Sequence, residues 1–187
     1  MAKILKGFKG LGIFPITKND AQGYTVGEKV PVNGAQSLSM EPDTEEWSIP
    51  ADDGVYESGS DLNGYGFKLT IAELPLEIRS HFEGGEYDKD TGVYSYYSDT
   101  VAPEIGISFQ ALTSDGNYRM YKVYALRCNA ITDVVNTKGS GDSATAVEIT
   151  GKITQRKTDN KVKDMKDSVT AADLAWLDEL VSTAPTP

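Results

Sequence analysis

The feature that most limits how this chain can fold is the spacing of its apolar residues, which alternate with polar ones in several separate segments. The clearest segment runs from Tyr65 to Ile71, and a second runs from Ile105 to Ala111. A period of two places apolar side chains on one face of a strand. Asp115-Gly116, a dipeptide typical of hairpin turns, leads from the second segment into Tyr118 to Cys128. The sequence therefore predicts a mainly β fold, a sandwich or barrel.

Weaker patterns predict further strands near Gly10 and at Gln36 to Met40, Glu46 to Ile49, Val93 to Tyr97 and Ala146 to Thr154. Pro42-Asp43 predicts a turn between the strands at Gln36 to Met40 and Glu46 to Ile49. Leu38, Met40 and Trp47 are the expected inward anchors on either side of it. Gly151 interrupts the last segment and indicates a β-bulge.

Two helices are predicted, because the apolar spacing changes in two places. Apolar residues recur every fourth position from Leu74 to Phe82, with Pro75 suited to the first turn and Gly84-Gly85 suited to end the helix. Thr170 to Val181 has an apolar stripe and begins with a pattern similar to a capping box. We therefore expect a β domain over residues 1–166, with an N-terminal arm and an extended loop near 50–64, and a helical extension over 167–187.

The charge distribution is uneven. The chain has 28 Asp and Glu against 18 Lys and Arg, a formal net charge of -10, which disfavours binding to nucleic acid phosphates. The stretch from Glu41 to Asp61 has eight acids and no Lys or Arg. A basic run from Lys152 to Lys166 contrasts with it and is either a solvated linker or a docking segment for the acidic stretch of another copy. The candidate docking residues are Arg156, Lys157, Lys161 and Lys163.

Several classes of site are disfavoured by what the chain lacks. Cys128 is the only cysteine and His81 the only histidine, which excludes an intrachain disulfide and a cysteine-rich zinc site and favours a reducing compartment. Both residues are expected to be ordinary structural ones. No signal peptide or membrane span is expected. We find no phosphate-binding loop and no G-x-S-x-G motif, so neither an enzyme nor a cofactor is expected.

Two acidic patterns have alternative interpretations. Asp52 and Asp53 could form a catalytic pair, but adjacent side chains on an extended segment point in opposite directions, which favours a solvated loop or a subunit contact. Asp88, Asp90 and Gly92 partly fit a calcium loop, but glycine occupies the third ligand position, which favours a plain turn.

Four tyrosines lie close together in the sequence: Tyr87, Tyr94, Tyr96 and Tyr97. Aromatic rings of this kind can stack on sugars, and tyrosine is also common at subunit interfaces. The pattern favours the interface. A carbohydrate-binding or adhesive module remains the alternative function.

The segments "ADDGVYESG", "LPLEI", "ISFQAL", "YRMYKVYALRC" and "VEITGKI", in this order, resemble the major tail proteins of long-tailed phages that infect Gram-positive bacteria. The resemblance covers about residues 11–166. It implies a β-sandwich with a flanking helix whose copies form hexameric rings, stacked into a tail tube in the virion after assembly in the host cytoplasm.

The resemblance also implies partners. These are further copies of the chain and other tail proteins, namely the tape measure, tail terminator and distal tail proteins. Genomic DNA is expected to pass through the lumen without specific binding, and no membrane insertion is expected. The extended acidic loop is expected to reach the adjacent ring or the lumen, and its candidate residues are Asp52, Asp53, Tyr56, Glu57 and Asp61.

Overall fold

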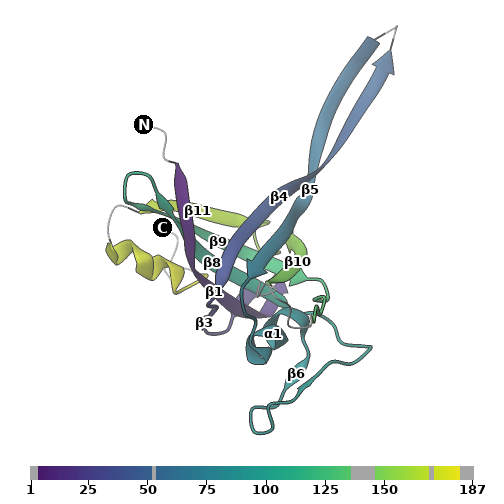
Figure 1. Cartoon of the computed structure of the whole chain (residues 1–187). Coiled ribbons are helices and arrows are strands. Elements are labelled where there is room, and N and C mark those ends of the chain that lie inside the picture. The colour runs from purple at the N-terminus through teal and green to yellow at the C-terminus, as the bar shows by residue number, and fades with distance from the viewer. Residues whose placement is uncertain (1–3, 52–53, 136–145, 169–170, 182–187) are drawn as a thin grey trace, which may run out of the picture.

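A computed structural model describes residues 4–51, 54–135, 146–168 and 171–181 (Figure 1). Strands dominate it, so the predicted mainly β class is confirmed. In chain order the elements are β1 (Leu5–Asp20), β2 (Gly23–Val26), β3 (Val30–Pro31), β4 (Ala35–Ala51), β5 (Gly54–Ile71), α1 (Leu76–Glu83), β6 (Glu86–Tyr87), β7 (Tyr94–Ser95), β8 (Glu104–Thr113), β9 (Tyr118–Cys128), β10 (Val147–Thr154), β11 (Lys163–Ser168) and the 3-10 helix η1 (Ala171–Leu177).

The main sheet is antiparallel and runs in the order β2-β1-β8-β9-β10-β5-β4. Strand β3 joins it beside β1, and β11 pairs with the first half of β9 while β10 pairs with the second half. The sheet curves round the core, so that β1 and β4 contact each other although no ladder joins them among the described residues. The predicted hairpin turn at Asp115-Gly116 is confirmed.

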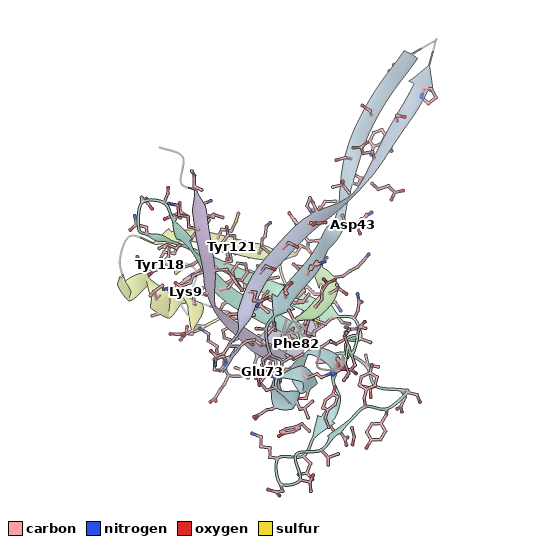
Figure 2. All side chains as sticks on the ribbon, in the orientation of Figure 1. Lys9, Asp43, Glu73, Phe82, Tyr118 and Tyr121 are labelled. Carbon is pink, nitrogen blue, oxygen red and sulfur yellow. The ribbon has the colours of Figure 1, made fainter. Side chains whose placement is uncertain are left out.

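The concave face of the sheet holds the main core. Phe67, Leu69 and Ile71 are at most 3% exposed, as their alternation predicts. Helix α1 closes this face with Phe82, which is fully buried (Figure 2). The helix ends at Gly84, whose φ of 84° lies in the left-handed region that glycine adopts without strain. The predicted helix is therefore confirmed to within two residues at its start.

The C-terminal segment covers the opposite face. Leu180 is 1% exposed and packs with Phe14 and Tyr124, and the hydroxyl of Ser108 donates a hydrogen bond to the carbonyl of Leu177 at 2.8 Å. The predicted C-terminal helix is present, but it is a 3-10 helix, and it spans Ala171–Leu177, which is shorter than the predicted range. Leu174, Leu177 and Leu180 recur every three residues, which is the period that a 3-10 helix aligns on one face.

Three further predictions are wrong in detail. Pro42-Asp43 is no turn, because β4 continues through it to Ala51. Strand β1 begins at Leu5, well before Gly10, and stays paired with β8 across two register shifts. The strand expected at Val93 to Tyr97 is reduced to Tyr94–Ser95.

Gly151 is not a bulge, since it pairs in register with both neighbouring strands. A Cβ at this position would lie 2.4 Å from the carbonyl oxygen of Arg127. Glycine is therefore required here because the backbone of β9 approaches closely.

Gly106 provides a test of how the C-terminal segment packs on the second face of the sheet. A Cβ on Gly106 would lie 2.1 Å from Cδ2 of Leu180, so we expect Gly106→Ala to lower the free energy of unfolding by about 1–3 kcal/mol through overpacking. Urea unfolding followed by tryptophan fluorescence would measure it. Gly54→Ala is the control, since a Cβ there meets no atom of the described residues within 4 Å. In a Leu180→Ala background, Gly106→Ala should lower the free energy of unfolding by less. An equal loss in both backgrounds would contradict this packing.

Candidate functional site: the arm formed by β4 and β5

Strands β4 and β5 extend far beyond the rest of the sheet. They are 17 and 18 residues long, but β10 pairs with β5 only between Tyr65 and Ile71. Beyond that point β4 and β5 pair only with each other among the described residues. We call residues 44–63 the arm. Figure 1 shows it projecting away from the body of the protein.

The arm leaves the body at a local irregularity. The register of β4 against β5 shifts between Asp43 and Thr44, and Gly64 opposite has a φ of 141°. A Cβ on Gly64 would lie 3.0 Å from the carbonyl oxygen of Ile153, at the end of β10. Bulges of this kind increase the local twist of a strand pair. The glycine and the bulge therefore set the direction in which the arm projects.

Neither face of the arm is covered. Every residue from Glu41 to Pro50 is exposed, and Tyr56 is 78% exposed. Trp47 packs on its cross-strand neighbour Gly59, where a Cβ would lie 2.7 Å from the indole. The prediction of Trp47 as an inward anchor is wrong, because its strand has already left the body, whereas Leu38 and Met40 do pack against the core.

The arm is a negatively charged ribbon. Of the acidic stretch, the described members are Glu41, Asp43, Glu45, Glu46, Glu57 and Asp61. Among them only Asp43, at the root of the arm, has an ion pair within the described residues, with Lys152 at 3.3 Å (Figure 2). The predicted site residues Tyr56, Glu57 and Asp61 therefore lie together on the arm, in strand β5. Asp52 and Asp53 lie outside the described residues.

The prediction of an extended loop near residues 50–64 is wrong, because the described residues there belong to the paired strands of the arm. Its residues form a regular ladder from Thr44 to Ile49, opposite Leu62 to Glu57. A two-stranded ribbon without a covering layer is marginally stable in water. An arm of this length, about 25 Å by the rise of a strand, is therefore the part of the described chain that most lacks a partner.

The predicted basic docking segment is largely occupied within the fold. The Arg156 side chain is 13% exposed, lies 4.3 Å from the ring centroid of Tyr124 and donates a hydrogen bond from Nε to Asp159 at 2.8 Å. Lys161 pairs with Asp164 at 3.3 Å. Lys163 belongs to β11, and its ammonium group lies 4.2 Å from the ring of Tyr65.

Lys157 differs from its neighbours, because its exposed side chain has no ion pair with any described residue. The segment is therefore neither a linker nor a row of free cations. Its aromatic contacts could not be predicted from a run of charges alone.

A second projection, residues 84–103, is held by a buried carboxylate that the sequence did not reveal. Glu83 is 3% exposed and accepts hydrogen bonds from Arg79 Nε at 2.6 Å, from the Ile131 N–H at 2.5 Å and from the Tyr94 hydroxyl at 3.1 Å. Burial and this hydrogen bond raise the pKa of Tyr94 to about 12. The one sequence signal was the i, i+4 spacing of Arg79 and Glu83 before Gly84.

The four clustered tyrosines do not form one platform. Tyr94 is committed to Glu83 and Tyr87 is half-buried, while Tyr96 and Tyr97 are 49% and 53% exposed. Within the described residues, no ring contact joins any two of them.

The remaining candidates have structural surroundings. The Asp88 carboxylate accepts hydrogen bonds from the Asp90 N–H at 2.9 Å and the Thr91 hydroxyl at 2.7 Å, which is the geometry of a turn. Cys128 is 4% exposed, and burial raises its pKa to about 12. His81 is a half-buried residue of α1. The described residues contain no group of three or more His, Cys, Asp and Glu side chains arranged to hold a metal ion.

A scan against models of known protein families gives no match, and a search of curated proteins gives no significant match either. None of the helices in the described ranges is long and apolar enough to cross a membrane.

Arg156 and Lys157 test whether the basic segment acts inside the fold. We expect Arg156→Ala to lower the free energy of unfolding by about 1–3 kcal/mol, because it removes a mostly buried cation from a ring and a carboxylate. Lys157→Ala should change it by less than about 0.5 kcal/mol. Urea denaturation measures both. Equal small losses would show that Arg156 is only a surface charge.

Asp159 predicts a pH dependence. The hydrogen bond from Arg156 holds the pKa of Asp159 at about 2, below its usual 3.8. Because the folded pKa lies below the unfolded one, this contribution to stability is present above about pH 4 and is lost as the pH falls towards 2. The stability difference between the wild type and Asp159→Asn, from thermal melts, should therefore shrink over that range. A difference that stays constant would refute the assignment.

Proposed function

We propose that this protein is a self-assembling structural subunit, and specifically the tail tube protein of a long-tailed phage. The observation that carries the proposal is the arm, an acidic two-stranded ribbon that lacks a covering layer in one copy. Such a ribbon gains stability when another surface covers it. The curved mainly β body with a flanking helix supports the same proposal, because it agrees with the fold implied by the resemblance of the sequence to major tail proteins.

The charge of the chain supports a tube that conducts DNA. A conduit must let its cargo pass, and an acidic wall repels phosphates. The formal net charge is -10, and several of the described basic side chains are paired with carboxylates of the same chain. The protein would then act as a structural component of the virion, not as an enzyme, and would contact tape measure, tail terminator and distal tail proteins in the assembled tail.

The alternative, a carbohydrate-binding or adhesive module, has weaker support. The tyrosines expected to stack on a sugar do not form one surface, because Tyr94 donates a hydrogen bond to Glu83 instead. Tyr96 and Tyr97 remain exposed and provide a variant that separates the two functions.

Replacing residues 44–63 with Asn-Gly tests the proposed function. The replacement joins Asp43 to Gly64, which already pair, through a two-residue hairpin turn. We expect the shortened protein to keep its circular dichroism spectrum and to remain monomeric in sizing columns. The wild type should form tubes visible by negative-stain electron microscopy.

The control is the double variant Tyr96→Ser, Tyr97→Ser, which should still form tubes. Tubes formed by the shortened protein would contradict the role of the arm. Glycan binding by a monomeric wild type that is lost in the double variant would favour the alternative function.

A further inference from the structure

The two long edges of the arm differ in what their backbones offer to another strand. Strand β4 contains Pro42 and Pro50, and proline in a sheet turns its nitrogen, which carries no hydrogen, towards the unpaired side. The two prolines are eight residues apart, and the register shifts between them add no extra residue to β4. Because eight is an even number, both prolines face the same edge of the strand. Even-numbered residues of β4 in the arm, including Ser48, therefore present their backbone groups to the free edge. Prolines interrupt that edge at both ends.

The free edge of β5 is regular from Glu57 to Leu62, between the two positions where its register against β4 shifts. In an antiparallel pair, directly opposite residues are of the same kind: either both direct their N–H and C=O groups towards each other, or both direct these groups to the outer edges. The partners of Thr44, Glu46 and Ser48 therefore present their N–H and C=O groups to the free side of β5; these partners are Leu62, Ser60 and Ser58. No proline lies between Gly54 and Gly64. The β5 edge of the arm can accept another strand without meeting a proline, whereas prolines interrupt the β4 edge at both ends.

Strand β11 is the edge strand that best matches it. The Tyr124 N–H donates to the Val162 carbonyl at 3.0 Å, so alternate residues from Lys163 onward face away from β9. Strand β11 is six residues long, has no proline, and contains Met165, which is 58% exposed. By comparison, β2 has only four residues and the first half of β1 is interrupted by register shifts.

Exposed apolar surface favours the same pairing, and charge permits it. Strand β11 is neutral, because Lys163 and Lys166 are offset by Asp164 and Asp167, so it repels the acids Glu57 and Asp61 of the arm less than a second arm would. Like charges opposite each other destabilise a ladder. Leu62 of the arm is 53% exposed, and Met165 can cover an apolar side chain of this kind. Within one copy the arm points away from β11 (Figure 1), so this pairing requires a second copy.

We propose that the β5 edge of the arm adds as a strand to the free edge of β11 in a second copy of the chain. The inference rests on the proposed self-assembly and specifies its contact. One edge meets a different edge, so each copy can both give and receive an arm, and the contact is heterologous unless two copies exchange arms with each other. Heterologous contacts build rings when the rotation closes and filaments when it does not.

Two serines that lie directly opposite each other provide a matched test. Ser58→Pro removes a backbone N–H from the β5 edge, while Ser48→Pro removes one from the β4 edge, and neither N–H belongs to the ladder between the two strands. We expect Ser58→Pro to raise the concentration needed for assembly at least tenfold, or to abolish assembly. Ser48→Pro should assemble like the wild type. Light scattering and sizing columns measure both.

Met165→Pro tests the receiving edge and should block assembly in the same way. An equimolar mixture of Ser58→Pro and Met165→Pro should stop at dimers, because one variant retains its β11 edge and the other retains its arm edge. Circular dichroism and thermal melts establish that each variant is folded. If Ser58→Pro is unfolded, Ser60→Pro and Glu46→Pro form an equivalent opposed pair.

The outcomes separate this inference from the proposed function. Normal assembly of Ser58→Pro, or a block by Ser48→Pro instead, would overturn the edge pairing while the wild type still forms tubes. A wild type that remains monomeric at every concentration would overturn the proposed function, and the edge pairing with it.

Discussion

The structure depends on how β5 satisfies its backbone hydrogen bonds. Between Tyr65 and Ile71 the strand is paired on both sides, with β4 and β10, and its alternate side chains fill the core. From Gly64 towards the tip it is paired on one side only among the described residues. One strand therefore belongs half to a folded domain and half to an incomplete sheet. Unpaired edges of this length are a hazard unless they are protected or used, and prolines interrupt only one of the two edges.

Sequence patterns predicted the structure correctly where a strand or helix buries one of its faces. Phe67, Leu69 and Ile71 alternate because one side of their strand packs on the core, and Gly84 ends the helix because its backbone adopts a positive φ. The arm has no such pattern, since both of its faces are exposed. Its acidic composition is typical of loops, and Pro42 fits a turn as well as it fits an edge strand. Only the pairing with β5 distinguishes the two.

The second face of the sheet shows another limit of sequence patterns. The C-terminal leucines predicted an apolar stripe, but their partners are Phe14, Tyr124 and the space above Gly106, all distant in sequence. Lys122 is 3% exposed under this segment, with its ammonium group 4.1 Å from the ring of Trp176. Burial lowers the pKa of Lys122. A lysine within a strand is expected to face solvent, so its burial was not predictable without knowing what covers it.

The charge of the arm restricts how copies can meet. Two arms placed side by side would bring Glu57 and Asp61 of one copy against the same acids of the other, and like charges across a ladder are destabilising. A symmetric contact between arms is therefore disfavoured by the same residues that favour a neutral or basic acceptor edge. Repulsion therefore favours a contact between the arm and a different surface over a contact between two arms. Contacts between unlike surfaces that repeat from copy to copy lead to closed rings or continuous filaments. In the proposed assembly, the acidic residues of the arm would therefore disfavour the pairing of two arms.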